Sequence, residues 1–180
     1  MPQEPASSEG GECMDGCNDV AMEMVMQEIA KKHIKFSEDY RDTIYLDSKR
    51  YPTFGWGHCY SSEHPFGSTR EYADWLFDMD YQRAYIDYLR IIREFGLENL
   101  SCPRRMVLLD MCYNMNYAKV KKFVNTLALM RNEQFEEAAE ALRQSAWYKQ
   151  TGTRARRLVH TVMTNSYPLI PDRTASGVQL

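Results

Sequence analysis

Hydrophobic positions in the first third of the chain recur at helical spacing and then give way to a β-type pattern. Residues 1–18 show no periodicity and are rich in Gly, Ser, Pro and Glu, which is typical of a loose tail. The apolar positions that follow repeat every three to four residues and predict an amphipathic helix that ends near Glu38. Residues 43–58 are rich in β-type residues around a turn at 48–50, so we predict a β-hairpin there.

The rest of the chain has the pattern of a helical protein. Ser68 and Glu71 form a capping-box signature that opens a helix running to Phe95, where Gly96 is a stop signal. At about 1.5 Å per residue this helix is roughly 40 Å long, which suits a bridge between two lobes. Apolar periodicity predicts further helices over residues 106–115, 119–131, 133–147 and 153–165, the last capped by Thr153.

These patterns predict an α+β fold that is mostly helical. The hydrophobic content of 44% is enough for one sizeable core or two small lobes. We expect a short antiparallel sheet in the N-terminal lobe and only helices in the C-terminal lobe. The expected parts are a flexible tail over 1–18, an N-terminal catalytic lobe over 19–68, a connecting helix over 69–95, a helical lobe over 96–167 and a C-terminal tail over 168–180.

The distribution of charge and the number of cysteines restrict the possible functions of the protein. Residues 101–180 carry 12 Lys and Arg against 6 Asp and Glu, a net of +6, which leaves −9 for residues 1–100 because the whole chain carries −3. This split indicates two faces of opposite sign and argues against a nucleic-acid binder, which is usually basic throughout. Five cysteines without a disulfide framework are typical of free thiols in a reducing cytosol.

Metal and membrane signals are weak. Cys13, Cys17 and His33 could bind a metal, but their spacing matches no standard zinc pattern. We therefore expect no metal and no cofactor. No apolar run is long enough for a membrane span or a signal-peptide core, so we also expect no stable membrane insertion.

Two carboxylates and a hydroxyl lie close together along the chain. Asp47 follows Glu38 by nine residues, and Thr53 comes six residues later. Hydrolysis of a glycosidic bond needs one protonated carboxyl group and one ionised carboxylate, and these two side chains could form that pair. By spacing alone, an acidic stretch on the surface is the favoured explanation of these residues.

Alternation along the second predicted strand suggests where a ligand would lie. Side chains on a strand point to opposite faces in turn, so Thr53, Gly55 and Gly57 would share one face. That face is small and open, as expected for a cleft wall, and the opposite face is expected to be buried.

From Glu38 to His58 the pattern resembles that of the phage-type lysozymes, also called endolysins, a family of glycoside hydrolases. That family has the same spacing of Glu, Asp and Thr, in a context similar to Tyr45-x-Asp47 and Thr53-x-Gly55-x-Gly57-His58. The resemblance resumes downstream in separated motifs that keep their order, at Arg104-Arg105, 111–115, 123–127, 137–139, 145–151, 154–157 and Thr161.

The resemblance implies a role for each matching residue. Glu38 matches the family's general acid, Asp47 its second carboxylate, and Thr53 the residue that helps to hold the attacking water. Further matches are expected to support the site: Arg154 by pairing with the acid, His58 and Asp80 as a buried structural pair, and Tyr45 beside Asp47. Expected substrate contacts are Cys59, Tyr113, Thr126, Asn114, Trp147 and Gly57, with a role in the core as an equal alternative for any one of these side chains.

Asp39 departs from the family, which usually has glycine at this position. Aspartate tolerates the left-handed conformation that a helix end can require. Its negative charge could also favour the protonated form of Glu38.

The resemblance implies a lysozyme (muramidase) that hydrolyses the β-1,4 bond between N-acetylmuramic acid and N-acetylglucosamine in bacterial peptidoglycan, with inversion, during phage lysis of the host. We expect a monomer made in the host cytoplasm without a signal peptide, reaching the periplasm through a holin-dependent lesion or within a virion. One alternative is a catalytically inactive glycan-binding or virion structural protein on the same fold. A lytic transglycosylase is a third reading, but it needs no water-activating residue such as Asp47.

Overall fold

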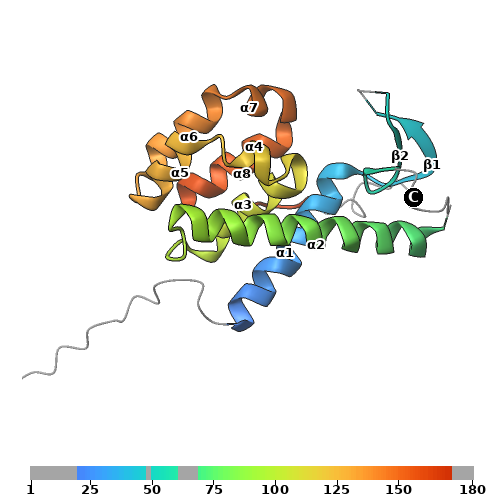
Figure 1. Cartoon of the computed structure of the whole chain (residues 1–180), viewed down its shortest axis with the longest axis horizontal. Coiled ribbons are helices and arrows are strands. Elements are labelled where there is room, and N and C mark those ends of the chain that lie inside the picture. The colour runs from blue at the N-terminus through green and yellow to red at the C-terminus, as the bar shows by residue number, and fades with distance from the viewer. Residues whose placement is uncertain (1–19, 48–49, 61–68, 172–180) are drawn as a thin grey trace, which may run out of the picture.

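Helices make up most of the protein, and a small sheet lies at one end of the longest helix (Figure 1). The computed structural model describes residues 20–47, 50–60 and 69–171. Its elements in chain order are α1 (Val20–Glu38), β1 (Arg41–Leu46), β2 (Pro52–Gly55), β3 (His58–Cys59), α2 (Arg70–Phe95), α3 (Cys102–Met115), α4 (Tyr117–Val120), α5 (Val124–Arg131), α6 (Phe135–Gln144), α7 (Ala146–Thr151) and α8 (Thr153–Thr164). The predicted α+β class is confirmed.

The long helix α2 joins the sheet to the group of shorter helices (Figure 1). The amide of Tyr72 donates to the hydroxyl of Thr69 over 3.2 Å, so Thr69 caps the first turn. The predicted cap, Ser68, lies outside the described residues. Gly96 ends the helix as predicted, since it adopts a left-handed φ of 64° and its amide bonds to the carbonyl of Ile92.

The sheet has three antiparallel strands in the order β1, β2, β3. The predicted hairpin is therefore present, but the prediction of a single second strand through residue 58 is wrong. Gly55 and Gly57 have φ values of +61° and +84°, which no pleated strand adopts, and the chain turns between them.

The expected open glycine face is wrong for the same reason. Gly55 packs so closely on α2 that an added Cβ would lie 2.7 Å from the Cβ of Ala73. Thr53 is also buried, with an exposed fraction of 3%. Of the two glycines, only Gly57 lies at the candidate site described below.

Two of the predicted helices are each divided in two. The expected helix over 119–131 is interrupted between α4 and α5, and the one over 133–147 is interrupted at Ser145. Ser145 takes an extended conformation, and its hydroxyl accepts from the amide of Tyr148 to start α7. Serine side chains compete with helical hydrogen bonding in this way, so they favour helix starts. The expected cap at Thr153 is also wrong, because α8 starts at Thr153 after Gly152 without a side-chain cap.

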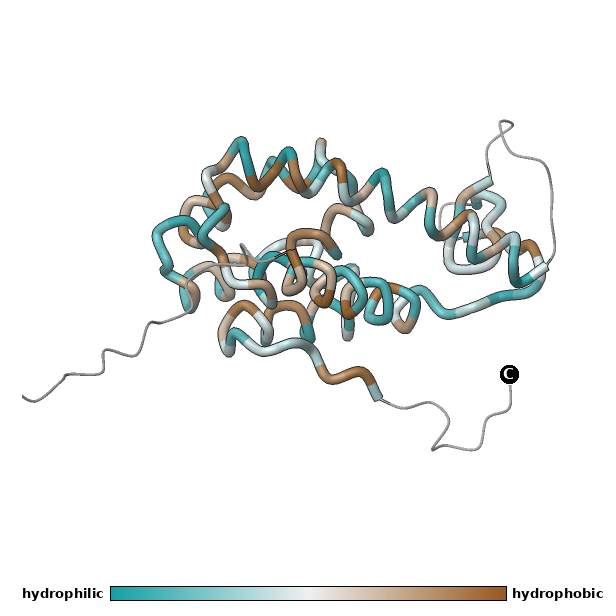
Figure 2. The backbone as a smooth tube through the Cα atoms, turned by 90° about the horizontal axis from the view of Figure 1, so that it is seen from below, coloured by the Kyte–Doolittle hydropathy of each residue, from teal (hydrophilic) through white to brown (hydrophobic). Residues whose placement is uncertain are grey.

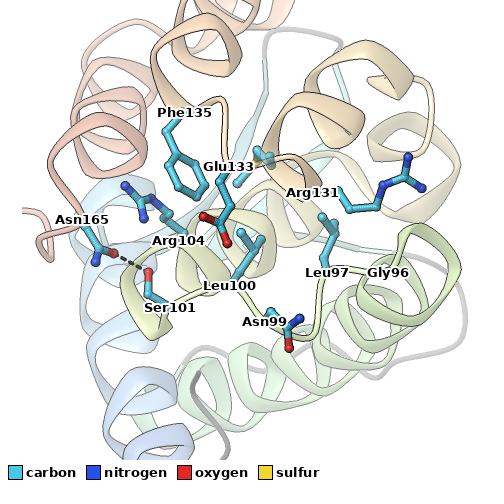
Figure 3. A pocket seen from close by; sticks show the side chains of 11 residues that line it. Gly96, Leu97, Asn99, Leu100, Ser101, Arg104, Arg131, Glu133, Phe135 and Asn165 are labelled. Carbon is cyan, nitrogen blue, oxygen red and sulfur yellow. Dashed lines mark hydrogen bonds between the residues drawn. The ribbon is translucent and has the colours of Figure 1, made fainter. Parts of the chain in front are cut away.

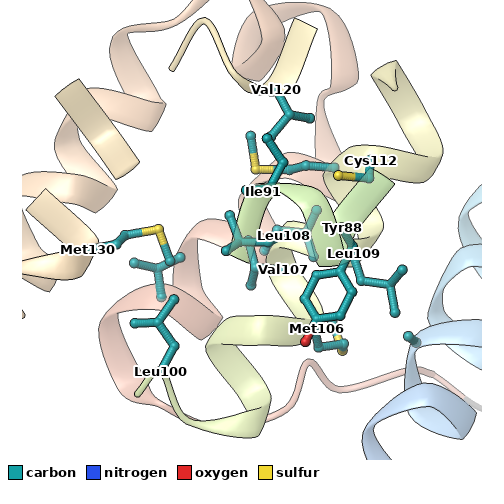
Figure 4. Packing of buried hydrophobic residues seen from close by; sticks show 14 of the residues in the cluster. Tyr88, Ile91, Leu100, Met106, Val107, Leu108, Leu109, Cys112, Val120 and Met130 are labelled. Carbon is teal, nitrogen blue, oxygen red and sulfur yellow. The ribbon is translucent and has the colours of Figure 1, made fainter. Parts of the chain in front are cut away.

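Most of the buried apolar surface lies where α3 is surrounded by the other helices. Figure 4 shows residues of α2 and α3, including Tyr88, Ile91 and Leu108, packed in this core. Along the helices hydrophobic and hydrophilic residues alternate, as expected when one face is buried (Figure 2). A separate cluster of Phe54, Tyr60, Ala73 and Leu76 lies between the sheet and the start of α2. The two clusters give each end of α2 its own apolar support.

The cysteines differ from expectation. Cys59 and Cys112 are free thiols, whereas Cys102 is disulfide-bonded, so the expectation of free thiols is wrong for Cys102. In the described parts of the chain, no helix combines the length and the apolar character that crossing a membrane requires.

Replacement of Gly55 by alanine should destabilise the fold through both backbone strain and collision with Ala73. Gly152→Ala is the matched control, because Gly152 has a similar φ of +62° but no atom within 4 Å of the added Cβ. We expect Gly152→Ala to lower the free energy of unfolding by about 1 to 3 kcal/mol from strain alone. Gly55→Ala should lose about 1 to 3 kcal/mol more from overpacking. Urea unfolding measures both, and equal losses would contradict the packing argument.

Candidate active site

Glu38 is the last residue of α1, and the helix ends there because the next residue turns out of the helical conformation. Asp39 has a φ of 61°, so its predicted left-handed conformation is confirmed. Its amide still bonds to the carbonyl of Lys35 over 3.3 Å, and its carboxylate accepts from the amide of Tyr40 over 3.1 Å. The side chain of Asp39 is solvent-exposed, so water and salt screen its charge.

Arg154 of α8 joins the Glu38 carboxylate to a second carboxylate, that of Asp110 in α3. Its Nη1 donates to Oε1 of Glu38, and its Nε donates to Oδ1 of Asp110 over 2.7 Å. Side-chain exposure falls from 24% for Glu38 to 7% for Arg154 and 0% for Asp110. The pair predicted from the resemblance is therefore present, and it is anchored to an acid in the protein interior.

The charges of this cluster compensate for its burial. Burial by itself would raise the pKa of Asp110, but the Arg154 charge and a hydrogen bond from His33 outweigh it and lower that pKa. Burial likewise opposes the charge on Arg154, yet the carboxylates of Asp110 and Glu38 raise its pKa. Asp110 and Arg154 are thus each held in the ionised form by their neighbours.

His33 and Arg157 extend the cluster back to α1. Nδ1 of His33 lies 2.8 Å from Oδ2 of Asp110, and Nε of Arg157 donates to Nε2 of His33 over 3.1 Å. Arg157 also donates to the hydroxyl of Ser37 over 3.0 Å. The hydrogen bonds therefore run in series from Ser37 through Arg157, His33, Asp110 and Arg154 to Glu38, and the peptide bond between Ser37 and Glu38 closes the series into a ring.

Sequence reasoning did not find Asp110, nor the role of His33. A signal was present, because Asp110 is the only charged residue between positions 106 and 115, in an otherwise largely apolar helix. A buried charge requires a partner, so this position predicts an ion pair without naming the partner.

The hairpin supplies the other predicted catalytic residues. The amide of Tyr51 donates to the Asp47 carboxylate over 2.8 Å and so orients it at the hairpin turn. The hydroxyl of Thr53 donates to the Tyr51 carbonyl over 3.0 Å. Tyr45 pairs with Thr53 across the strands and is half-buried. Burial and the nearby charges of Glu38 and Asp47 raise the pKa of Tyr45, against the opposing effect of Arg41, which indicates that Tyr45 lies near both carboxylates.

Gly57 lies directly against the Glu38 carboxylate. A Cβ at this position would be 2.8 Å from Oε2 of Glu38 and 3.4 Å from its carboxyl carbon. The glycine therefore lets the turn between β2 and β3 approach the end of α1. Gly57 was predicted at the site from the alternation of side chains along a strand. The structure places it there instead because it packs against the Glu38 carboxylate.

The other supporting pair, His58 and Asp80, is also brought together. Nδ1 of His58 lies 2.7 Å from Oδ2 of Asp80 on α2, which ties the sheet to the connecting helix. Cys59 follows on the opposite side of the strand and is exposed.

Two cavities flank the contact between Glu38 and Gly57. The larger, about 580 Å³, lies against the helical lobe and is lined by Ser37, Glu38, Asn114, Met115, Lys119, Lys122, Phe123, Trp147, Gln150, Thr151 and Arg154. The other, about 380 Å³, is lined by Gly57, His58, Cys59, Asp80, Arg83, Ala84, Asp87, Cys112, Tyr113 and Asn116. Residues at the end of α3 contribute to both cavities, so the two lie side by side along the molecule.

Most of the predicted substrate contacts line these cavities. Nε1 of Trp147 donates to the side chain of Asn114 over 3.0 Å, and Phe123 packs edge-on against the Trp147 ring. Tyr113 packs against Phe77, and burial raises the pKa of its phenol. Thr126 is buried in α5 and lines neither of the two cavities. Lys119, Lys122 and Gln150 line the larger cavity without having been predicted.

A third cavity, about 350 Å³, lies in the helical lobe away from these residues (Figure 3). Arg104 lies over the ring of Phe135 there, and Ser101 bonds to Asn165. None of the predicted site residues lines it.

The described residues also bear on the weak metal hypothesis. His33 uses both ring nitrogens within the hydrogen-bonded ring, and Cys13 and Cys17 lie outside the described residues. Over 20–47, 50–60 and 69–171, no three His, Cys, Asp or Glu side chains are grouped so that they could hold a metal ion.

Comparison with known proteins relates the chain to two phage proteins and to a T4-type lysozyme. No protein-family model matches it. It is 28% identical over 158 residues to the pre-baseplate central spike protein Gp5 of Enterobacteria phage T4, an alignment that covers 74% of this chain and 27% of that protein. It is 28% identical over 133 residues to the peptidoglycan hydrolase gp36 of Pseudomonas phage phiKMV, covering 72% of this chain and 14% of that protein.

A third relative is a probable T4-type lysozyme of Dictyostelium discoideum, 34% identical over 68 residues, which are 38% of this chain and 40% of that protein. The chain thus matches between 14% and 40% of the lengths of these relatives. The predicted resemblance to the phage-type lysozymes is confirmed.

The lowered pKa of Asp110 predicts how stability changes in acid. Its contribution is fully present above the ordinary carboxyl value of 3.8 and is lost as the pH falls through the lower folded value. Denaturant unfolding from pH 7 to pH 2 should therefore show wild type more stable than Asp110→Asn at neutral pH, with a gap that narrows below pH 4.

Asp78→Asn is the control for this experiment. Asp78 is 59% exposed and pairs with Lys31 over 3.4 Å, an interaction that solvent weakens. Its replacement should change stability little at any pH. A gap between wild type and Asp110→Asn that stays constant down to pH 2 would contradict the assignment.

Proposed function

We propose that this protein is a muramidase that hydrolyses the β-1,4 bond between N-acetylmuramic acid and N-acetylglucosamine in bacterial peptidoglycan. The observation that carries the proposal is the Glu38 carboxylate, which Arg154 fixes at the edge of a cavity and which lies against Gly57, next to the sheet whose hairpin bears Asp47 and Thr53. Relatives named lysozyme and peptidoglycan hydrolase support the same class of reaction.

In the proposed reaction Glu38 donates a proton to the oxygen of the leaving sugar. The bond from the anomeric carbon to that oxygen breaks as a water molecule attacks the carbon from the opposite side. Asp47 accepts a proton from this water. Asp47 then releases its proton to solvent and Glu38 takes one up, so both carboxyl groups return to their starting states and the net reaction consumes one water.

Thr53 is suited to orient the attacking water. Its hydroxyl hydrogen is used in the bond to the Tyr51 carbonyl, which leaves oxygen lone pairs to accept from a water. A water that donates to both Thr53 and Asp47 directs its own lone pair toward the sugar. An inverting reaction of this kind places the two carboxyl groups roughly 6.5 to 9.5 Å apart, with the water between them.

The larger cavity would accept the glycan on the helical lobe. Trp147 and Phe123 offer apolar faces, Asn114 offers an amide, and Lys119 and Lys122 add positive charge. An anionic polymer such as peptidoglycan is attracted to such a surface. The similarity to a phage spike protein supports delivery of the protein within a virion.

Glu38→Gln should abolish activity while leaving the fold intact, because glutamine can still accept from Arg154 but cannot donate a carboxyl proton. We expect clearing of permeabilised Gram-negative cells to fall by at least about 100-fold, the usual contribution of general acid catalysis. Glu28→Gln is the matched control, since Glu28 is an exposed glutamate on the same helix. Equal clearing by wild type and Glu38→Gln would contradict the assignment of Glu38 as the general acid, whereas no clearing by wild type would leave a glycan-binding protein as the better description. Analysis of the reducing ends and of the fresh anomer would test the bond and the inversion.

Gly57→Ala should impair activity by displacing the acid. The added methyl group would lie 2.8 Å from Oε2 of Glu38, so the carboxylate or the turn must move. A displacement of about 1 Å at a reacting group can cost about 100-fold in rate, so we expect a fall in kcat on soluble glycan fragments of more than about 10-fold. Unfolding is measured in parallel, with Gly152→Ala as the control for strain at positive φ. Full activity in a folded Gly57→Ala variant would show that this contact does not position Glu38.

A further inference from the structure

The ring of hydrogen bonds behind Glu38 has a fixed direction. Arginine nitrogens can only donate, so Nε2 of His33, which receives the Nε hydrogen of Arg157, must be an acceptor. The ring hydrogen of His33 is then on Nδ1 and is donated to Asp110. His33 is therefore neutral, and a second hydrogen on Nε2 would point at the guanidinium of Arg157.

The charges of the ring cancel when Glu38 is ionised. Glu38 and Asp110 contribute two negative charges, Arg154 and Arg157 contribute two positive charges, and His33 contributes none. Asp110 and His33 are both fully buried, so water does not weaken their interactions. The cluster therefore transmits a change in charge at one member to its neighbours.

Arg154 is shared between two competing carboxylates. The more strongly Asp110 holds its guanidinium, the less of its positive charge is available to the ionised form of Glu38. His33 in turn affects the interaction of Asp110 with Arg154. Its Nδ1 hydrogen bond stabilises the Asp110 carboxylate and so weakens the attraction of that carboxylate for the Arg154 guanidinium.

Other charged or titratable groups near Glu38 and Asp110 lie outside the ring. Tyr45 of β1 and Tyr113 of α3 lie close enough to Glu38 for its charge to affect their phenols, and Asp39 follows it in sequence. Lys119 and Lys122 line the same cavity as Glu38. Tyr113 also lies near Asp110. Among the described contacts, none of these groups hydrogen-bonds to Asp110. The side chains that hydrogen-bond to Asp110 are those of His33 and Arg154.

We propose that Asp110 and His33 are positioning residues for Glu38, which act through Arg154 and set the pH range over which Glu38 can donate its proton. This inference rests on the proposed function of Glu38 as the general acid. It assigns a task to two fully buried polar side chains that touch no substrate.

The test compares pH profiles of kcat/KM on soluble glycan fragments for wild type and three ring variants. Asp110→Asn removes the competing negative charge, so Arg154 should favour ionised Glu38 more strongly. The alkaline limb should move to lower pH by about one unit, the usual effect of an unopposed opposite charge. His33→Leu removes the hydrogen bond to Asp110 and strengthens its pull on Arg154, so the limb should move to higher pH.

His33→Gln is the conservative variant. Its amide can donate to Asp110 and accept from Arg157, as the neutral imidazole does, so its profile should match that of wild type. Asp80→Asn is a second control, because it alters a similar His-Asp pair that does not contact Arg154. It should lower stability without moving the alkaline limb.

The outcomes separate this inference from the proposed function. If Glu38→Gln is as active as wild type, the proposed function fails. A second outcome is an inactive Glu38→Gln together with an alkaline limb of the kcat/KM profile that lies at the same pH in Asp110→Asn, His33→Leu and wild type. In that case the proposed function stands and the inference is overturned. If Asp110→Asn does not fold, the contrast between His33→Leu and His33→Gln decides alone, and identical limbs in these two variants overturn the inference.

Discussion

The arrangement of the site depends on one buried guanidinium. Arg154 can form its two bonds only if α1 ends at the mouth of the larger cavity, α3 passes behind it, and α8 carries the arginine between them. A buried carboxylate such as Asp110 is tolerable only when it is paired and hydrogen-bonded. The apolar core around α3 and the polar ring beside it therefore constrain each other, because moving any of the three helices would leave a charge in the interior without its partner.

The sheet adds a second constraint at the same point. Two left-handed residues, Asp39 and Gly57, bring the end of α1 and the turn before β3 into contact around the Glu38 carboxylate. Arg154 approaches the carboxylate from the helical side and Gly57 from the sheet side. A carboxyl group enclosed in this way keeps few rotamers, which is the kind of preorganisation that a catalytic acid requires.

Local patterns in the sequence were sufficient for much of the fold. The apolar repeat and the Gly96 stop signal predicted the long helix, and β-type residues predicted the hairpin. The resemblance to phage-type lysozymes brought Glu38 and Arg154 together across 116 positions, which no local pattern could do. The glycine alternation failed because it assumed a regular strand, whereas positive φ values at Gly55 and Gly57 bend the chain. His33 and Asp110 were missed because pairing across 77 positions depends on how helices pack, and a single polar residue in an apolar stretch does not identify its partner.

Stability alone gives little reason for this polar ring. Apolar side chains of similar size in place of His33 and Asp110 could fill the same space without the cost of removing charges from water, and such replacements are often neutral or stabilising. The ring does supply something that apolar packing cannot. It gives Arg154 two carboxylate partners, Asp110 in the protein interior and Glu38 at the solvent-accessible cavity. The interior partner holds the guanidinium in place when the accessible one changes its protonation state, so Arg154 remains oriented through a reaction in which Glu38 gives up and regains a proton.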